Sequence, residues 1–322
     1  MIFDESHPRL KGFNEYFRRE IEPALTEMEG ARRSALRQGQ IAIAVLAVPA
    51  AYLLFRAWQM HGDGDWQGWL FGGLACLAAG VGFGYYQISK VKSGFDTHVA
   101  GSICRFLELD YTRQCRFSPL ARFRELSLIP SYDKSDLEDE ISGRIGDIEL
   151  HLVEARLQDK RTTTDSKGNR KTSYHTVFRG LLAEFTFPKR VKARTIITQD
   201  SGKIFNKFKS WGIQGDRVSL EDPEFERIFE VFSSDQVEAR YLLTPRFMER
   251  LVDLSRHFDR GLQLAFDQDR LYLAGPKREN MFEAGSVFSD LTDTKYVAET
   301  LAEIRIILDI IDILNLESTS KV

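Results

Sequence analysis

Carboxylates and histidines are the side chains of this chain whose types and spacing could do chemistry. A hydrolase needs an acid and a base, or a set of metal ligands, that converge in one pocket. Five acidic residues lie close together in the sequence, and two histidines lie in a segment with strand-like alternation. The candidates are Asp222, Glu224, Glu226, Asp235, Glu238, His151 and His175.

The local pattern gives these residues simpler roles. Asp222 precedes Pro223, which is the arrangement of a helix N-cap followed by proline at the first helical position. Glu224 and Glu226 then lie in the first turn, where negative charge is favoured. Motifs of metalloproteases, phosphate-binding loops, nucleophile elbows and dinucleotide-binding turns are absent, and the three cysteines lack metal-ligand spacing. We therefore expect no catalytic residue, no metal site and no cofactor.

Two apolar stretches near the start of the chain, residues 38–55 and 66–89, contain no charged residue. A helix needs roughly 20 apolar residues to cross the hydrocarbon core of a bilayer, so both can span it. Lysine and arginine residues precede the first stretch and follow the second, whereas the loop that connects the two carries Asp63 and Asp65. The positive-inside rule then predicts a multi-pass protein of the inner cell membrane with both termini cytoplasmic. The alternative is a buried core helix or a signal peptide.

Small residues recur at every fourth position of the second stretch. Gly72, Cys76, Gly80 and Gly84 would stack on one helix face and form a ridge that lets helix backbones approach closely. Two interpretations stay open: the ridge packs against the first span of the same chain, or it joins subunits.

Basic residues are concentrated in the middle of the chain. Residues 156–217 contain 15 Lys and Arg but only 5 Asp and Glu. Lys and Arg near an anionic leaflet each add about 1 kcal/mol of attraction. A solvated face or a match to the acidic C-terminal part would explain the same charge, and no motif supports nucleic-acid binding. The residues expected at the membrane surface are Arg32, Arg33, Arg37, Lys90, Lys92, Lys189, Arg190, Lys192 and Arg194.

Periodicity divides the chain into four parts. We expect an amphipathic N-terminal helix in residues 1–37, a transmembrane hairpin in 38–89, a membrane-proximal helix in 90–117 and a cytoplasmic domain in 118–322. The two flanking helices would form a stalk. The predicted class is α+β, with an antiparallel sheet and helices in the cytoplasmic domain.

Within that domain, alternating residues 148–157 and 177–187 predict a long hairpin around a polar loop at 162–173, and residues 262–273 predict a second hairpin. An acidic stretch, 133–140, precedes the first hairpin. We expect helices after Asp222, extending to Phe232, and after Thr244, with a strand over 237–243 between them. A final helix is expected over 294–314.

Several runs resemble a known protein family. They are LIPSYD (128–133), LHLVEARL (150–157), FRGLLAEFTFPK (178–189) and LEDPEFERIFEVFSSDQVEARYLLTPRFMERL (220–251). The family is an uncharacterised bacterial family of two-span inner-membrane proteins, domain-of-unknown-function family 3137. The resemblance implies a bacterial membrane protein, and it brings no activity, substrate or catalytic residue.

Two functions follow as expectations. The first is a membrane-anchored interaction module, a scaffold or adaptor, whose partners are the lipid bilayer and either further copies of itself or another membrane protein. The second is a lipid- or small-ligand-binding domain at the inner leaflet; a hydrolase has less support. A pocket with basic residues at its rim would favour ligand binding, whereas a solid core with an exposed apolar patch would favour a scaffold.

Overall fold

The computed structural model describes residues 3–60, 66–164, 170–187, 190–199, 216–259, 261–283 and 289–319. It divides into two compact units. The helical unit comprises Met1–Ser102 and Ala284–Glu299, and the sheet unit comprises Ile103–Glu283 and Thr300–Val322.

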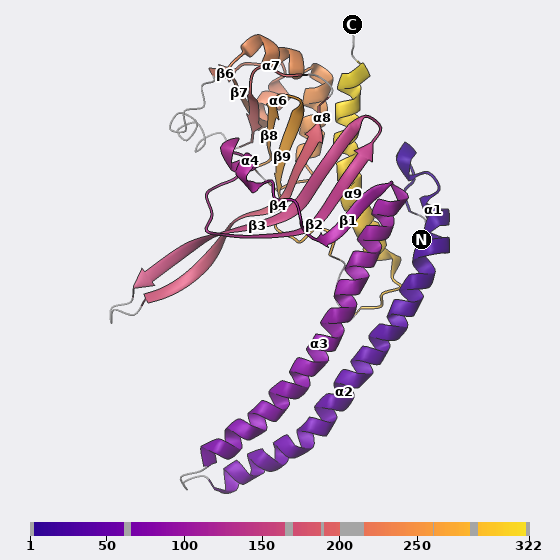
Figure 1. Ribbon diagram of the computed structural model, residues 1–322, viewed down its shortest axis with the longest axis vertical. Helices are drawn as coiled ribbons and strands as arrows, with labels where there is room; N and C mark the ends of the chain where they lie inside the picture. The colour runs from indigo at the N-terminus through magenta and orange to yellow at the C-terminus, as the bar shows by residue number, and fades with distance from the viewer. Residues whose placement is uncertain are drawn as a thin grey trace. The chain divides into compact units, whose positions relative to one another are not determined.

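Two long antiparallel helices make up most of the helical unit (Figure 1). Short turns, η1 (Pro8–Leu10), α1 (Phe13–Tyr16) and η2 (Phe17–Ile21), lead into α2 (Glu22–Gln59), and α3 (Trp66–Phe106) returns. Each helix continues through its apolar stretch into the flanking amphipathic segment, as expected for a stalk. At the N-terminal end of this stalk, the ring of Phe3 packs edge-on against the rings of Phe13 and Phe17, with centroid distances of 5.3 and 4.8 Å.

The apolar stretches of α2 and α3 are long and apolar enough to cross a membrane, judged by length and composition. Their large side chains are mostly exposed rather than packed in a core: Val48 is 72% exposed and Phe71 66%.

The sheet unit is built on nine described strands in the order β1-β2-β3-β4-β9-β8-β5-β7-β6. Every neighbouring pair is antiparallel. The strands are β1 (Leu109–Gln114), β2 (Lys134–Ile145), β3 (Ile148–Thr164), β4 (Arg170–Thr186), β5 (Thr195–Thr198), β6 (Asp216–Val218), β7 (Glu230–Ser233), β8 (Gln263–Asp267) and β9 (Arg270–Pro276). The predicted α+β class and both predicted hairpins are confirmed.

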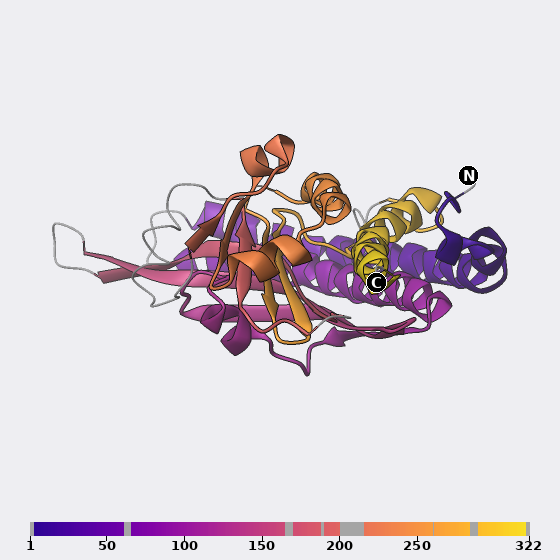
Figure 2. The ribbon, with the colours of Figure 1, turned by 90° about the horizontal axis from the view of Figure 1, so that it is seen from above.

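Helices cover both faces of this sheet. They are α4 (Leu120–Glu125), α6 (Pro223–Ile228), α7 (Gln236–Leu242), α8 (Pro245–Ser255) and α9 (Thr294–Thr319). On one face, Phe123 of α4 meets Tyr272 of β9, with ring centroids 5.7 Å apart. On the other, Phe247 of α8 meets Phe266 of β8 at 5.8 Å. Figure 2 shows α4 and α8 on opposite sides of the strands.

Several local expectations differ from the structure. Helix α3 ends at Phe106 rather than at residue 117, because Glu108 adopts a left-handed conformation (φ 60°) and β1 begins at Leu109. The acidic stretch 133–140, after which the strands were expected to begin, already lies mostly in strand β2. Residues 237–242 lie in helix α7 instead of a strand, because the carboxylate of Asp235 accepts hydrogen bonds from two backbone N–H groups and caps a helix there.

Phe232 lies in β7 rather than on the preceding helix, which ends at Ile228. The predicted loop 162–173 is also shorter than expected, since β3 runs to Thr164 and β4 begins at Arg170. Beyond the ends of β2 and β9, strands β3 and β4 pair only with each other among the described strands. Residues 159–164 of β3 and 170–175 of β4 form this two-stranded ribbon. Neither face of the ribbon is buried, so it shows no apolar alternation in the sequence.

Candidate functional site

A cleft of about 770 Å³ lies beside β4, where β9 stops pairing with it. Four of its described lining residues are cationic. The described lining residues are Pro130, Arg156, Thr176, Val177, Phe178, Arg179, Asp259, Gly261, Gln263, Pro276, Lys277 and Arg278.

Two glycines allow the backbones next to this cleft to approach closely. A Cβ atom on Gly180 would lie 2.1 Å from the carbonyl oxygen of Gly275. Gly180 also has φ +145°, which side-chain-bearing residues rarely adopt. A Cβ on Gly275 would in turn lie 2.3 Å from the ring of Phe258. Larger residues at these positions would therefore push β4, β9 and the segment at Phe258 apart.

The segment after β9 is tied to the cleft wall by backbone hydrogen bonds. The N–H of Lys277 donates to the carbonyl of Arg179 at 2.8 Å, and the N–H of Arg278 donates to the carboxylate of Asp259 at 2.8 Å. The N–H of Asp259 donates to the carbonyl of Pro276 at 2.9 Å. These hydrogen bonds hold Lys277 and Arg278 beside a third cationic residue, Arg179 on β4.

Arg156 and Arg179 are directly opposite each other on β3 and β4. Like charges in this position destabilise a sheet, so their pairing needs a compensating interaction. Among the described residues, the lining combines four cationic side chains with a single carboxylate, Asp259. An anion bound in the cleft would supply the compensation.

Two buried polar atoms of the lining have no hydrogen-bonding partner among the described residues: Nε of Arg179 and Oε1 of Gln263. Buried polar atoms are almost always hydrogen-bonded, and exceptions need an explanation such as a missing ligand or water. Arg179 carries the positive charge and Gln263 carries an amide that can also present donors. Of the two unpartnered atoms, Nε of Arg179 is a donor that could bind an oxyanion, whereas Oε1 of Gln263 is an acceptor and could not.

Behind Arg179 lies Glu154, whose side chain is 2% exposed. Its Oε1 is 3.7 Å from Nε of Arg179, which is too long for a hydrogen bond, while its other oxygen accepts the N–H of Met281 at 2.9 Å. Burial raises the pKa of Glu154 to about 8, and the nearby carboxylate of Asp139 adds to this. The Met281 N–H and the Arg179 guanidinium oppose the shift without cancelling it.

Glu154 belongs to a larger buried acidic group. Asp139 lies at a bulge in β2 with φ 55°, and its carboxylate accepts a 2.5 Å hydrogen bond from the hydroxyl of Tyr111. Burial raises the pKa of Asp139 to about 6, although the Tyr111 hydrogen bond lowers it. The same burial raises the pKa of Tyr111. At pH 7, Tyr111 is neutral and Glu154 is mostly protonated, whereas Asp139 is mostly ionised. Glu154, the member of the group that lies beside Arg179, therefore leaves the charge of that guanidinium largely intact.

The carboxylates that suggested a hydrolase do not converge. Asp222 and Asp235 cap α6 and α7, and Glu238 accepts hydrogen bonds from the N–H groups of Lys192 and Ala193. Glu226 accepts the N–H of Leu220 at 2.7 Å, and Glu224 faces Arg256 at 3.8 Å.

The two histidines also lie apart from any such centre. His151 bonds to Glu140 at 2.8 Å and stacks on Phe117, whereas His175 lies on the exposed ribbon beside Ser173. Within the described ranges, no group of His, Cys, Asp and Glu is arranged to hold a metal ion.

The residues expected at the membrane surface have varied surroundings. Arg32 is buried against Glu29, and Arg33 pairs with Glu29 and Asp290. Arg37, Lys90, Arg190 and Lys192 are exposed, Lys92 is half-buried, and Lys189 lies outside the described residues.

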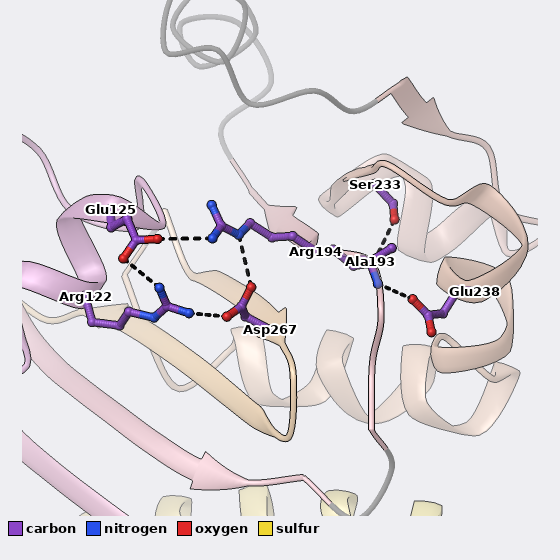
Figure 3. A network of polar contacts seen from close by, with 8 residues as sticks. Arg122, Glu125, Ala193, Arg194, Ser233, Glu238 and Asp267 are labelled. Carbon is purple, nitrogen blue, oxygen red and sulfur yellow. Dashed lines mark hydrogen bonds and ion pairs between the residues drawn. The ribbon is translucent and has the colours of Figure 1, made fainter.

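Arg194 belongs to the network in Figure 3, where it and Arg122 share the carboxylates of Glu125 and Asp267. Arg194 is 3.2 Å from each of its two partners. Its charge is therefore neutralised within the sheet unit, whereas the exposed residues retain theirs for a membrane surface, which stays a prediction.

Part of the small-residue ridge faces the other helix of the hairpin. A Cβ on Gly84 would lie 3.4 Å from Cα of Gly39, and one on Gly80 would lie 3.3 Å from Cα of Ile43. A Cβ on Gly72 would lie 3.5 Å from Cδ1 of Leu53, and Cys76 is half-buried. Gly80 and Gly84 thus pack α3 on α2 within one chain.

The cleft was not predicted from the sequence, although Arg156 and Arg179 belong to the basic segment 156–217. Arg156 breaks an apolar run and Arg179 follows Phe178 directly, so each resembles an ordinary solvent-facing strand residue. Only the cross-strand register, which the sequence does not display, brings them together.

Comparison with known protein families gives one match. Residues 176–316 match a family model described as a protein of unknown function (DUF3137). The match confirms the resemblance seen in the sequence, and two of the four runs on which that resemblance rested lie within it. No curated protein matches the chain.

Among solved structures, the crystal structure of the mycobacterial trehalose monomycolate transport factor A, TtfA, is similar at 10% identity. The alignment covers 69% of this chain and 93% of that one, with a TM-score of 0.35. A similarity of this size carries no argument about the function of the present protein.

Proposed function

We propose that this protein is a membrane-anchored binding protein whose sheet unit holds an anionic ligand in the cleft between β4 and the segment after β9. The observation that carries the proposal is the pair of facing arginines, Arg156 and Arg179, beside two further cations, with the buried Nε of Arg179 lacking a hydrogen-bonding partner among the described residues. Guanidinium groups bind phosphate and carboxylate through paired hydrogen bonds, so these are the ligand groups expected.

Membrane anchoring is the second part of the proposal. The core helix of a soluble protein would be mostly buried, yet only 11% and 17% of the most apolar windows of the two helices are buried. Exposed Trp58 and Tyr85 at the ends of the apolar stretches suit the two membrane interfaces. We place both termini in the cytoplasm of a bacterial cell, on the charge pattern of the flanks.

An apolar scaffold surface has less support. In the described part of the sheet unit, the large exposed hydrophobic side chains are Tyr174, Val237 and Tyr241, which are too few for an extended apolar patch. Self-association through the second span is also less supported, since Gly80 and Gly84, which could have joined subunits, contact α2 of the same chain. The basic cleft therefore favours ligand binding.

The proposal is tested by titrating the full-length protein, in nanodiscs of zwitterionic lipid, with sodium sulfate, glycerol 3-phosphate and pyrophosphate, followed by calorimetry. Arg179→Gln should weaken binding of the best probe about tenfold or more, because a hydrogen bond to a charged group contributes roughly 1.5–3 kcal/mol. Arg156→Gln should act in the same direction.

Arg240→Gln is the matched control, since Arg240 is exposed on α7 and bonds only within its own helix among the described contacts. Nanodiscs containing anionic lipid separate the two sources of the anion: competition by that lipid against the soluble probe identifies a headgroup. Equal affinity of the Arg179→Gln variant and the wild type would contradict the proposal, as would absence of binding by every probe.

A further inference from the structure

The two-stranded ribbon of the sheet unit is a second feature without an assigned role. β3 and β4 are each 17 residues long. The pairing of β2 with β3 ends at Gln158, and the pairing of β9 with β4 ends at Gly180. Residues 159–164 of β3 therefore have β4 on one side and no described strand on the other (Figures 1 and 2).

Backbone alternation identifies the groups along this free edge. The N–H of Lys160 points away from β4, because it donates to the carboxylate of Asp133 at 2.7 Å. N–H and C=O groups of an antiparallel strand turn to the same side at every second residue. Thr162 and Thr164 consequently present their N–H and C=O groups to the same free edge, as an unused template for a further strand.

An acidic residue already occupies the start of this edge. Asp133, just before β2, bonds through its backbone N–H to the carbonyl of Gln158 and through its carboxylate to the N–H of Lys160. Pro130, three residues earlier, lacks an N–H, so this chain is not well suited to continue a strand there. This contact shows that the edge can bind an extended backbone segment that carries a carboxylate.

The charge on the ribbon favours the same kind of partner. Its described residues carry four cations and one carboxylate; these are Lys160, Arg161, Arg170 and Lys171 on one hand and Asp159 on the other. Side chains within reach on neighbouring strands repel when their charges are alike, so pairing of the ribbons of two copies of this chain is disfavoured. An acidic strand would instead be attracted.

We propose that the free edge of β3 at residues 160–164 binds an acidic, extended segment of another protein, which adds to the sheet as an extra strand. Its backbone would pair with Lys160, Thr162 and Thr164. Carboxylates on one face of the added strand would lie beside Lys160, and those on the other face would lie beside Arg161 and reach towards Lys171. Main-chain hydrogen bonds supply affinity in this mode of recognition, and side chains supply specificity.

The test uses the full-length protein in nanodiscs and three labelled peptides, read by fluorescence anisotropy. The first alternates Glu and Val, the second alternates Lys and Val, and the third is the Glu-Val peptide with alternate backbone N–H groups methylated. We expect the acidic peptide alone to bind. Hydrogen exchange should then slow at the amides of Thr162 and Thr164.

Two variants separate backbone pairing from charge. Thr162→Pro removes one outward N–H on an edge where proline is tolerated, and the Lys160→Glu, Arg161→Glu double substitution reverses the charge. Each should weaken binding about tenfold. Arg240→Glu on α7 should leave it unchanged, and circular dichroism checks that every variant is folded.

Several outcomes overturn the proposal. They are binding of the methylated peptide as tight as that of its parent, equal loss in the α7 control, or slowed exchange confined to residues outside 160–164. Absence of binding by the acidic peptide also overturns it; crosslinks between two ribbons would then identify a second copy as the occupant, and binding of duplex DNA by the ribbon would identify nucleic acid.

Discussion

Glu154 and Arg179 form the pair of residues on which the proposed site depends most. The carboxyl faces Arg179 from β4, the N–H of Met281 after β9, and the carboxyls of Glu138 and Asp139 from β2. In its neutral form Glu154 leaves the guanidinium charge available to the cleft. Once ionised, it would attract the same guanidinium and lower the positive potential that an anion meets.

Anion affinity should therefore depend on pH through Glu154. Because the pKa of Glu154 is raised to about 8, the carboxyl is mostly protonated at pH 7 and mostly ionised at pH 9. Sulfate keeps its charge over this range, so it reports the protein alone. We expect sulfate affinity, measured by calorimetry, to fall several-fold between the two values, as about 1 kcal/mol of lost attraction would produce.

The Glu154→Gln variant isolates this effect, because the amide is close in shape but does not ionise. It should bind sulfate at pH 7 about as tightly as the wild type and lose the fall at pH 9. A variant that retains the full dependence on pH would show that another group causes it.

At the scale of elements, α2 is joined to the segment before α9, within the helical unit, by the buried carboxylate of Glu29. The carboxylate of Glu29 accepts hydrogen bonds from Arg32 at 2.8 Å, from Arg33 at 2.7 Å and from the N–H of Leu291 at 3.0 Å. The hydrogen bond from Arg32, followed by those from Leu291 and Arg33, lowers the pKa of Glu29 to about 2 against the effect of burial. One carboxylate thus joins two segments that are far apart in the sequence.

Glu29→Gln should loosen this attachment. The lowered pKa means that the carboxylate stabilises the fold above about pH 4.5 and that this contribution is lost as the pH falls towards 2. At pH 7 we expect a loss of about 3 kcal/mol, since removing one partner leaves a buried charge unpaired.

The measurement is the rate of hydrogen exchange at the amide of Leu291 at pH 7, together with thermal unfolding. Glu27→Gln, two residues earlier on the exposed side of α2, is the control. If exchange at Leu291 were equally slow in Glu29→Gln and the wild type, the carboxylate would not be what holds the segment.

Elements with a buried face could be predicted from the sequence, and those without one could not. The hairpin of β8 and β9 and the capped helix α8 follow from alternation and from Thr244 before Pro245. The ribbon escapes detection because its threonines and lysines are exposed on both faces. The sequence predicts a strand in place of helix α7, because Val237 and Tyr241 suggest strand-like alternation. In the structure both side chains are exposed, and the residues that this short helix buries are Ala239 and Leu242.

At the scale of the whole molecule, the uneven distribution of charge acquires a partial explanation. The basic segment supplies Arg156 and Arg179 to the cleft, Arg194 to an internal network and Lys160, Arg161, Arg170 and Lys171 to the ribbon. These are three separate uses of positive charge. A count of charges along the sequence shows the excess but cannot assign it, because the assignment depends on strand pairing.

Topology is the prediction that concerns the entire chain. Arg37 and Lys90 flank the apolar stretches on one side and Asp63 and Asp65 lie between them, so we expect the hairpin to enter and leave the membrane from the cytoplasm. Alkaline phosphatase, which is active only after export, should be inactive when fused after Val322 and active when inserted between residues 61 and 65. Green fluorescent protein at the same two positions should give the reverse pattern. Active phosphatase after Val322 would overturn the orientation, and recovery of the untagged protein in the soluble fraction would overturn the membrane anchor itself, leaving the exposed apolar side chains of α2 and α3 to be covered by another protein.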